Sequence, residues 1–547
     1  MRLAQAQRRG DAQVRAEFVR EVARAGIGVG AAVLDRHAPD HARSPATSAR
    51  RQAIAYTRAM PTPLTPATPS RLLAEQALSR AAGAPLLSGN AVDLLIDATA
   101  HYEAWLAAIC GARQRVLLEN YIIRDDEVGR AFRDALVERA RAGVFVAVVV
   151  DWLGCLGQSG RAFWAPLRAA GGEVRVFNPL QLGEPLGWVS RDHRKLLVVD
   201  GELGFLSGVC ISAKWLGDPA RGVPPWRDTG VALRGPAVAE LEAAFAQSWG
   251  ETGAALRPFA EAPEPAMPAA HVSLRLIATQ PSTAATYRLD QLIAAMARKT
   301  LWLTDAYFVG LAPYVQALVA AARDGVDVRL LVPGSSDIPI VAGMSRSGYR
   351  PLLKAGIRVF EWNGSMLHAK TAVADGQWAR VGSSNLNIAS WLGNRELDVA
   401  VEDAGFAGQL AAQYEQDLGN ATEIVLASRR RRHGSGSRER VCRSKARVPH
   451  VRHAGGSSGR AAAGALRIAN SVGAALANRR VLDDTGSGSL VIGTLVLGAL
   501  AVVGFAWPAG IGWPLGALAA WFALNLGIRS WRVRKRRWRE LRNADDD

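Results

Sequence analysis

Two distant segments of the chain carry the same three residue types at the same spacing. In each, a histidine is followed two positions later by a lysine and five positions after that by an aspartate: His193, Lys195 and Asp200, then His368, Lys370 and Asp375. An imidazole titrates near neutral pH and can act as a nucleophile or a proton donor, and an ammonium group stabilises phosphate oxygens. Brought together, the two sets would supply a nucleophile, an acid and two cations for displacement at phosphorus. We therefore expect two half-sites that act on a phosphate ester.

The spacing within each motif predicts different roles for its members. His193 and Lys195 lead into an apolar run at 196–199 that is typical of a β-strand. Residues i and i+2 of a strand project from the same face, so the imidazole and the ammonium group are expected side by side. Asp200 is an odd number of positions from His193 and would face the other way, as would Asp375 from His368. We expect both aspartates to be structural hydrogen-bond partners rather than participants in the reaction.

The sequences around the two motifs also resemble each other. Residues 112–121 match residues 297–307, each an apolar strand run followed by a helical stretch, and a second apolar strand run follows at 145–150 and at 327–332. This pattern predicts an α/β fold made of two fused repeats, each a mixed β-sheet flanked by helices. The two histidines are then expected to meet at the interface of the repeats.

Each histidine needs an acidic partner that fixes its orientation and tautomer. Asp228, in Trp226-Arg-Asp-Thr-Gly-Val, and Glu396, in Asn394-Arg-Glu-Leu-Asp-Val, occupy matching places in the two halves, and each leads into a predicted strand. We predict that these two acids orient the histidines, either within their own half or in the opposite half.

Polar side chains near the ends of the predicted strands are candidates for a pocket that holds the substrate headgroup. These residues are Glu119, Tyr121, Asp305 and Tyr307.

Charge and composition divide the rest of the chain. The formal net charge of +17 favours a polyanion or an anionic membrane surface as partner. The predicted segments are an N-terminal arm and Pro-rich linker without fixed structure (1–85), the first repeat (86–250), a linker (251–270), the second repeat (271–426), a basic disordered tether (427–458), an amphipathic helix (459–482), a membrane hairpin (489–528) and a basic cytoplasmic tail (529–547). Met60, at the start of the Pro-rich linker, is an alternative start of the chain.

The membrane hairpin rests on two apolar runs, at 490–505 and 513–528, which a Trp507-Pro-Ala-Gly segment separates. Each run is short of, or just near, the roughly 20 residues that cross a bilayer, which favours a tight hairpin over one long span. Basic residues flank both ends, and by the positive-inside rule both flanks and the catalytic portion face the cytoplasm. The alternative is a buried pair of apolar helices in a soluble domain.

Cysteine and histidine usage predicts neither a metal nor another cofactor. Cys110, Cys155, Cys210 and Cys442 show no CxxC spacing, and the nine histidines form no HExxH pattern. This usage agrees with a reducing compartment.

The motifs resemble those of a known family. His193-Arg-Lys-Leu-Leu-Val-Val-Asp200 and Leu367-His-Ala-Lys-Thr-Ala-Val-Ala-Asp375 resemble the paired HKD motifs of the phospholipase D superfamily, and residues 118–129, 225–231 and 365–370 are most similar to bacterial cardiolipin synthases. The resemblance extends over residues 86–426. It implies a phosphatidyltransferase of the inner membrane, facing the cytoplasm, that transfers a phosphatidyl group between phospholipids through a phosphohistidine. Its substrates would be phosphatidylglycerol, alone or with phosphatidylethanolamine.

The resemblance also implies residue roles. The family's catalytic set corresponds to His193, Lys195, Asp200, His368, Lys370 and Asp375. His193 would be the nucleophile and His368 the acid and later the base, although the reverse assignment is also open. Lys195 and Lys370 would hold phosphate oxygens, together with Asn385, Ser207 and Ser383.

The first half departs from the family at Cys210. This residue is as far from His193 as Asn385 is from His368, and the family usually has asparagine there. A thiol is a poor hydrogen-bond donor, so the phosphate cradle is expected to be lopsided, with the hydroxyl of Ser207 as a compensation.

Two other functions compete with the transferase. A hydrolytic phospholipase D would let water take the place of the acceptor alcohol. A nuclease, or a basic nucleic-acid-binding protein, would use the arginines, but these cluster in the tether near the apolar segments rather than around the motifs. Nucleic acid is therefore the less favoured partner. One chain supplies both half-sites, so no partner is expected to be needed to complete the site. The sequence predicts no particular oligomeric state.

Overall fold

The computed structural model describes residues 69–179, 190–257, 270–426, 479–482 and residue 513. The predicted tether (427–458), membrane hairpin (489–528) and basic tail (529–547) lie outside these ranges, apart from residue 513. Among the helices that the structure describes, none has both the length and the apolar character needed to cross a bilayer.

Two predicted boundaries need correction. The N-terminal segment was expected to lack fixed structure up to residue 85, but α2 (Pro69–Ala82) is a helix. It packs against α7 (Ala285–Met296), and Leu78 and Ala82 are buried in the core of the second half, which is what stabilises it. Residues 479–482, expected at the end of an amphipathic helix, instead form the strand β16 (Arg479–Leu482), which pairs in parallel with β15 (Ala421–Leu426).

The first half alternates strands and helices. Its elements are β1 (Leu87–Ile96), α3 (Asp97–Gly111), β2 (Arg115–Asn120), α4 (Glu127–Arg141), β3 (Phe145–Asp151), α5 (Ala165–Ala169), β4 (Glu173–Phe177), β5 (Lys195–Val199), β6 (Leu203–Ser207), the short 3₁₀ helices η3 (Ala213–Leu216) and η4 (Pro219–Arg221), β7 (Thr229–Arg234) and α6 (Ala237–Glu251). Local sequence explains their boundaries. Asp126 caps α4 by accepting the N–H of Gly129 (2.9 Å), and Gly143, at φ 85°, follows its end.

The second half follows the same plan. Its elements are β8 (Val272–Thr279), α7, β9 (Thr300–Thr304), α8 (Ala312–Arg323), β10 (Asp327–Pro333), α9 (Pro339–Ser347), α10 (Tyr349–Lys354), β11 (Arg358–Trp362), β12 (Thr371–Ala374), β13 (Trp378–Gly382), the π-helical turn η5 (Ala389–Gly393), β14 (Glu396–Glu402), α11 (Ala404–Leu418) and β15.

The described strands form one mixed sheet of 16 strands, in the order β16-β15-β11-β10-β9-β12-β13-β14-β8-β1-β7-β6-β5-β2-β3-β4. Read outward from the central β8–β1 pair, the order β1-β7-β6-β5-β2-β3-β4 mirrors β8-β14-β13-β12-β9-β10-β11. The strands β2 to β4 are parallel to one another, as are β9 to β11, whereas β5 and β12 run antiparallel to β2 and β9. The predicted mixed α/β sheet is therefore confirmed.

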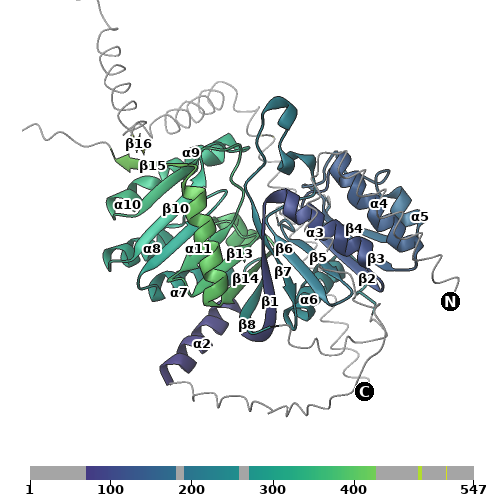
Figure 1. The fold of residues 1–547 in the computed structure, drawn as a ribbon, viewed down its shortest axis with the longest axis horizontal. Coiled ribbons are helices and arrows are strands. Elements are labelled where there is room, and N and C mark those ends of the chain that lie inside the picture. Colours follow the sequence, from purple (N-terminus) through teal and green to yellow (C-terminus); the bar gives the residue numbers. More distant parts are fainter. Residues whose placement is uncertain (1–68, 180–189, 258–269, 427–478, 483–512, 514–547) are drawn as a thin grey trace, which may run out of the picture.

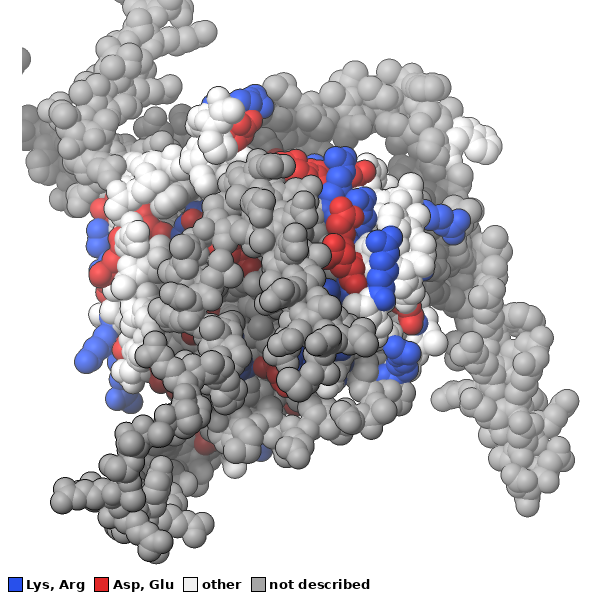
Figure 2. Space-filling model, turned by 45° about the vertical axis from the view of Figure 1, so that its right-hand side comes forward, with Lys and Arg blue, Asp and Glu red and all other residues white. Residues whose placement is uncertain are grey.

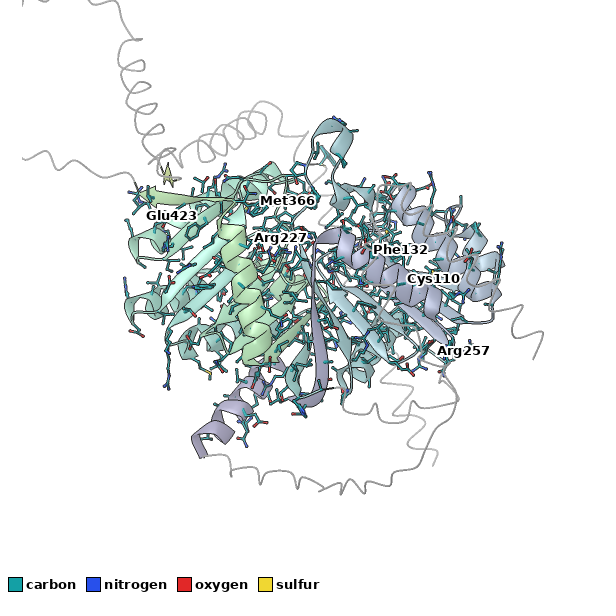
Figure 3. The ribbon with its side chains drawn as sticks, viewed as in Figure 1. Cys110, Phe132, Arg227, Arg257, Met366 and Glu423 are labelled. Atoms are coloured by element: carbon teal, nitrogen blue, oxygen red, sulfur yellow. The ribbon has the colours of Figure 1, made fainter. Side chains whose placement is uncertain are left out.

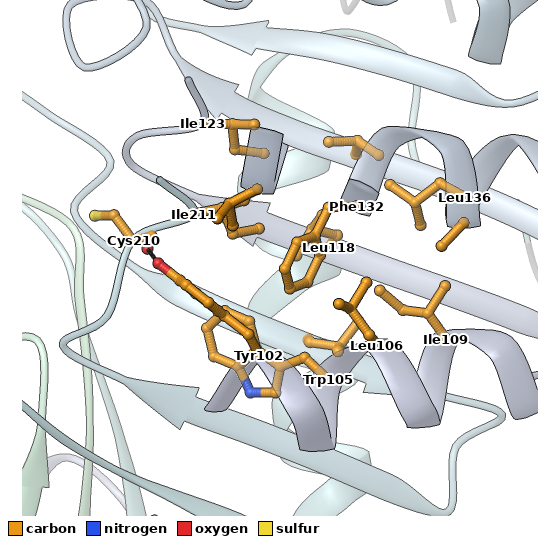
Figure 4. Packing of buried hydrophobic residues seen from close by; sticks show 14 of the residues in the cluster. Tyr102, Trp105, Leu106, Ile109, Leu118, Ile123, Phe132, Leu136, Cys210 and Ile211 are labelled. Carbon is orange, nitrogen blue, oxygen red and sulfur yellow. Dashed lines mark hydrogen bonds between the residues drawn. The ribbon is translucent and has the colours of Figure 1, made fainter. Parts of the chain in front are cut away.

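The helices cover the sheet in separate layers (Figure 1). One layer, with α3 and α4, packs on the first half around Trp105 and Phe132, where aromatic and branched side chains interlock (Figure 4). A second layer, with α7, α8 and α10, covers the second half. A third core contains side chains of both halves together with α6 and α11, and contacts between β6 and β14 and between β7 and β13 bring the halves together. This shared core fixes the two halves relative to each other.

Candidate active site

Both motif histidines lie at the same edge of the sheet, just before β5 and β12. β5 begins at Lys195, opposite Asn120 at the end of β2, and β12 begins at Thr371, opposite Thr304 at the end of β9. The backbone N–H of His193 donates to Arg395 O (2.9 Å), a residue of the other half. The first histidine is therefore held against the backbone of the other half, and the second histidine is held in the same way.

In the second motif, His368 contacts the backbone of Arg227, a residue of the first half. The backbone N–H of His368 donates to Arg227 O (2.7 Å), and the N–H of Arg227 donates to Met366 O (2.9 Å). Figure 3 shows Arg227 and Met366 close together between the two halves. The guanidinium of Arg227 is buried and donates to Asp417 on α11 (2.9 Å), so the segment that carries Asp228 is anchored to the second half.

The two predicted acids contact the histidines crosswise. Oε2 of Glu396 lies 2.8 Å from Nδ1 of His193, and Oδ2 of Asp228 lies 2.7 Å from Nδ1 of His368. Of the two arrangements that the sequence left open, the structure has each acid in contact with the histidine of the opposite half. With Nδ1 engaged by a carboxylate, Nε2 is the ring nitrogen that can meet a substrate.

Each carboxylate has further donors, and these differ between the halves. The hydroxyl of Ser383 donates to Oε2 of Glu396 (2.6 Å), whereas the indole Nε1 of Trp215 donates to Oδ2 of Asp228 (3.1 Å). The ring of Trp215 also meets His368 edge-on, with 5.5 Å between centroids. Sequence reasoning missed Trp215, because nothing in its spacing links it to a motif.

The two motif lysines are buried beside the histidines. Nζ of Lys195 donates to the backbone oxygen of His193 (2.5 Å), and Nζ of Lys370 donates in the same way to the backbone oxygen of His368. Both ammonium charges act on both imidazoles, since each contributes to lowering the pKa of His193 and of His368. Each imidazole is therefore near the ammonium group of its own half and also near that of the other half.

Burial governs the protonation of this cluster. Burial and the charge of Lys370 lower the pKa of His368 to about 4, and burial lowers the pKa of His193. Burial also lowers the pKa of Lys370 to about 8. Burial acts to raise the pKa of Asp228, but the charge and hydrogen bond of His368 outweigh it and hold that pKa well below its usual range. Near pH 7 we therefore expect Asp228 to be ionised and the imidazole of His368 to be neutral in the ligand-free protein.

The motif aspartates lie away from this cluster. The carboxylate of Asp200 accepts the backbone N–H groups of Arg113, Gln114 and Arg115 (2.8–2.9 Å) at the start of β2. Asp375 does the same at the start of β9, with three bonds of 2.7–2.9 Å. Both aspartates are therefore structural hydrogen-bond partners, and their inclusion in a catalytic set needs correction, since their carboxylates hold backbone at the far ends of β5 and β12.

The candidate phosphate ligands have different surroundings. The hydroxyl of Ser383 has a single proton, which it directs to Glu396, so we no longer expect it to donate to a phosphate. The hydroxyl of Ser207 accepts the N–H of Val209 (2.7 Å). Asn385 is buried, and its side-chain amide nitrogen is a donor that a phosphate oxygen can accept. It remains the strongest candidate of the three.

Cys210 lies near the charged groups of the site. Burial raises the pKa of its thiol, against the opposing charge of Lys195. Its backbone oxygen accepts a hydrogen bond from Tyr102 (2.6 Å), at the margin of the core that Figure 4 shows. A neutral thiol therefore stands at the place that matches Asn385.

Of the headgroup candidates, the two tyrosines contact the motif histidines, and the two acids are buried near the motifs. The ring of Tyr121 is 4.9 Å from that of His193, and the ring of Tyr307 is 5.8 Å from that of His368. Asp305 is buried and accepts the N–H of Leu386 (2.8 Å), and burial raises its pKa to about 7. Glu119 lies on the opposite face of β2 from Asn120, which pairs with Lys195. There it lies near Asp192, the residue before His193, since burial and the nearby charge of Glu119 raise the pKa of Asp192.

Known proteins resemble much of this chain, and a family model covers the second motif. A family model described as "Cardiolipin synthase, PLD-like domain" matches residues 290–418. Cardiolipin synthase A of Pseudomonas aeruginosa is 35% identical over 366 residues, which are 65% of this chain and 72% of that protein. The chain belongs to the cardiolipin synthase family. This confirms the resemblance seen in the sequence, and with it the prediction of a phosphatidyltransferase of the phospholipase D superfamily.

Two further comparisons describe the extent of the likeness. The cardiolipin synthase of Alkalihalophilus pseudofirmus is 32% identical over 347 residues, which are 62% of this chain and 68% of that protein. Among solved structures, the phosphatidylserine synthase of Haemophilus influenzae matches 64% of this chain and 91% of that chain, at 14% identity and a TM-score of 0.48. Two residues next to Asp228 were not predicted from the sequence. The indole of Trp215 donates to its carboxylate, and Gly208 lies against the carboxylate with no room for a Cβ.

Proposed function

We propose that this protein transfers a phosphatidyl group between phospholipids, as a membrane-associated enzyme of cardiolipin synthase type, through a phosphohistidine intermediate. The observation that carries the proposal is the crossed pairing of His193 with Glu396 and of His368 with Asp228. Two imidazoles with their Nδ1 atoms engaged, and two lysine charges that act on both rings, are what a two-step displacement at phosphorus requires without a metal.

In the first step, Nε2 of His193 attacks the phosphorus of the donor phosphodiester. The P–N bond forms as the bond from phosphorus to the leaving alcohol oxygen breaks, and protonated His368 gives its proton to that oxygen. The negative phosphate raises the low pKa of the buried His368, which allows it to hold the proton that it donates. Lys195 and Lys370 neutralise the non-bridging oxygens.

In the second step, the hydroxyl of an acceptor lipid attacks the phosphohistidine. His368, now neutral, accepts the hydroxyl proton, the new P–O bond forms, and the P–N bond to His193 breaks. Glu396 and Asp228 hold the rings and stabilise their positive charge in turn, because carboxylates that contact Nδ1 favour the imidazolium.

The two halves act in this proposal as fused repeats. Support comes from their mirrored strand order and from the equivalent placing of His193 and His368 before β5 and β12. A pair of repeats in one chain forms the whole site without a partner subunit, because each half supplies the acid for the other.

Phosphatidylglycerol, alone or with phosphatidylethanolamine, is the proposed substrate, and the inner membrane the proposed location, with the site facing the cytoplasm. Family membership and the apolar, basic-flanked sequence at 489–528 support this. A nucleic-acid substrate has less support. On the described part of the face seen in Figure 2, Lys and Arg lie among Asp and Glu rather than in one basic patch.

The deciding experiment incubates the purified full chain with labelled phosphatidylglycerol, with and without phosphatidylethanolamine, and separates the lipid products. A four-chain lipid that disappears in His193→Ala and in His368→Ala supports the transfer. Phosphatidic acid and free glycerol as the main products would indicate hydrolysis instead. Acid-labile label on residue 193, located by mass spectrometry after rapid quenching, would identify the nucleophile.

A further inference from the structure

Large apolar side chains are exposed on the loops and short helices that follow the strands at the active-site edge of the sheet. We call this set the mouth rim, and it consists of Leu153, Leu156, Val223, Ile338, Met344, Ile388 and Leu392. The exposed fraction reaches 56% for Leu156, 53% for Ile388 and 51% for Met344. Single exposed apolar residues are ordinary, but a concentration of them around a functional site marks an interaction surface.

The rim residues share one edge because of the strand directions. They follow the ends of β3, β6, β10 and β13, and the parallel and antiparallel pairings bring those ends to the edge where β5 and β12 begin. His193 and His368 precede β5 and β12. In Figure 1 this edge carries α9, while α2 lies at the opposite end of the sheet.

Contacts across the halves tie the rim loops together. Nζ of Lys214, before β7, lies 3.4 Å from Asp337, before α9, and the hydroxyl of Tyr307 donates to the same Asp337 (2.7 Å). The hydroxyl of Ser365 donates to Pro224 O (2.8 Å). The loop at 214–224 of the first half is therefore held against loops of the second half.

We propose that the mouth rim is the surface with which the catalytic domain docks on a phospholipid bilayer, apart from any anchoring by the C-terminal sequence. The inference rests on the proposed function, since both of its substrates would then be bilayer lipids whose phosphates must reach buried histidines. Rim side chains that enter the boundary between headgroups and acyl chains would remove apolar surface from water.

The charges on the rim fit an anionic bilayer. The side chain of Arg221, two residues before Val223, is 81% exposed, although Asp218 lies 3.9 Å from it, and Arg161 is exposed in the loop of Leu156. Cations near the membrane surface add attraction to anionic headgroups. The surface therefore combines apolar side chains with cations, as an interfacial membrane site does.

The first test measures turnover by the full chain on two forms of phosphatidylglycerol, vesicles and a short-chain lipid below its micelle concentration. The variant Ile338→Ser/Met344→Ser/Ile388→Ser/Leu392→Ser should lose at least about tenfold in turnover on vesicles and keep turnover on the monomeric lipid. The matched control is Leu73→Ser/Met296→Ser, two exposed apolar residues on α2 and at the end of α7, remote from the rim. A rim variant that equals this control on vesicles would overturn the docking surface.

A second test does not depend on activity. An environment-sensitive fluorophore on Ile388→Cys, in full chain with Cys110 and Cys442 replaced by serine, should shift to the blue and be quenched by brominated lipid when vesicles of phosphatidylglycerol are added. The same label on Met296→Cys should not. If the wild type turns over neither lipid but the label at 388 responds, docking stands and the proposed function fails. Equal responses of the labels at 388 and 296 to vesicles would reject docking. A response to protein concentration rather than to vesicles would also reject it, and would favour a second copy of the chain as the partner.

Discussion

Glu396 and His193 are a hydrogen-bonded pair, 2.8 Å apart, although they are far apart in the sequence and belong to different halves of the chain. Asp228 and His368 form the reciprocal pair at 2.7 Å. Neither half therefore contains a complete histidine–carboxylate unit of its own, so damage to one half should impair the histidine of the other.

Glu396→Gln should lower kcat by about 10² to 10⁴ with little change in KM, because the amide can no longer stabilise the imidazolium of His193. Since the two residues act as a unit, His193→Ala combined with Glu396→Gln should be no worse than His193→Ala alone. Steady-state kinetics of the double-mutant cycle checks this. Glu240→Gln, an exposed residue of α6, is the control. Additive losses would contradict the pairing.

Gly208→Ala should inactivate the enzyme without unfolding it. A Cβ at residue 208 would lie 2.2 Å from Oδ1 of Asp228, so the carboxylate must move away from His368. We expect kcat to fall by at least about a hundredfold, the scale of losing one aligned acid–base group. Circular dichroism would report an unchanged fold. Gly160→Ala, where a Cβ would meet nothing within 4 Å, should behave as wild type.

Binding of a phosphate analogue such as tungstate should take up protons. The pKa of His368 is about 4 in the ligand-free protein, so the ring is neutral at pH 6, and a bound anion raises that pKa. Between pH 4 and the raised value the complex holds more protons than the free protein, so affinity should fall as pH rises. Isothermal titration calorimetry in buffers of different ionisation enthalpy measures the uptake, which His368→Gln should reduce. Proton release on binding would contradict this protonation scheme.

Cys210→Asn and Asn385→Cys should have opposite effects. The first adds an amide donor at the place of a neutral thiol, and one hydrogen bond of about 1 kcal/mol would raise kcat/KM by up to about fivefold. The second removes the only asparagine of the matched pair and should lower kcat/KM by tenfold or more. Cys110→Ser, at a half-buried cysteine of α3, is the control. If both changes altered kcat/KM in the same direction and to the same extent, residues 210 and 385 would not both bind the phosphate of the substrate.

Asp200→Asn and Asp375→Asn should weaken the fold rather than the chemistry. Each carboxylate accepts three backbone N–H groups, and loss of its charge should lower the free energy of unfolding by roughly 1–2 kcal/mol. Thermal unfolding followed by fluorescence measures this change. Turnover of the folded protein at low temperature should stay within about twofold of wild type. A large loss of kcat in a stable variant would return these residues to the catalytic set.

The sequence by itself identified the candidate motif residues and the plan of the catalytic portion. Residue type and spacing are local properties, so the paired motifs, the mixed α/β sheet and the structural role of Asp200 and Asp375 could be predicted from them. The helix α2 could not, because its stability comes from packing on α7 rather than from its own sequence.

Only the tertiary structure decided which acid serves which histidine, that Ser383 donates to Glu396, that Glu119 faces away from Lys195, and that Trp215 contacts both Asp228 and His368. These relations join residues that are remote in the chain. They depend on how the shared core of α6, α11 and the two halves of the sheet sets one half against the other, which no local pattern encodes.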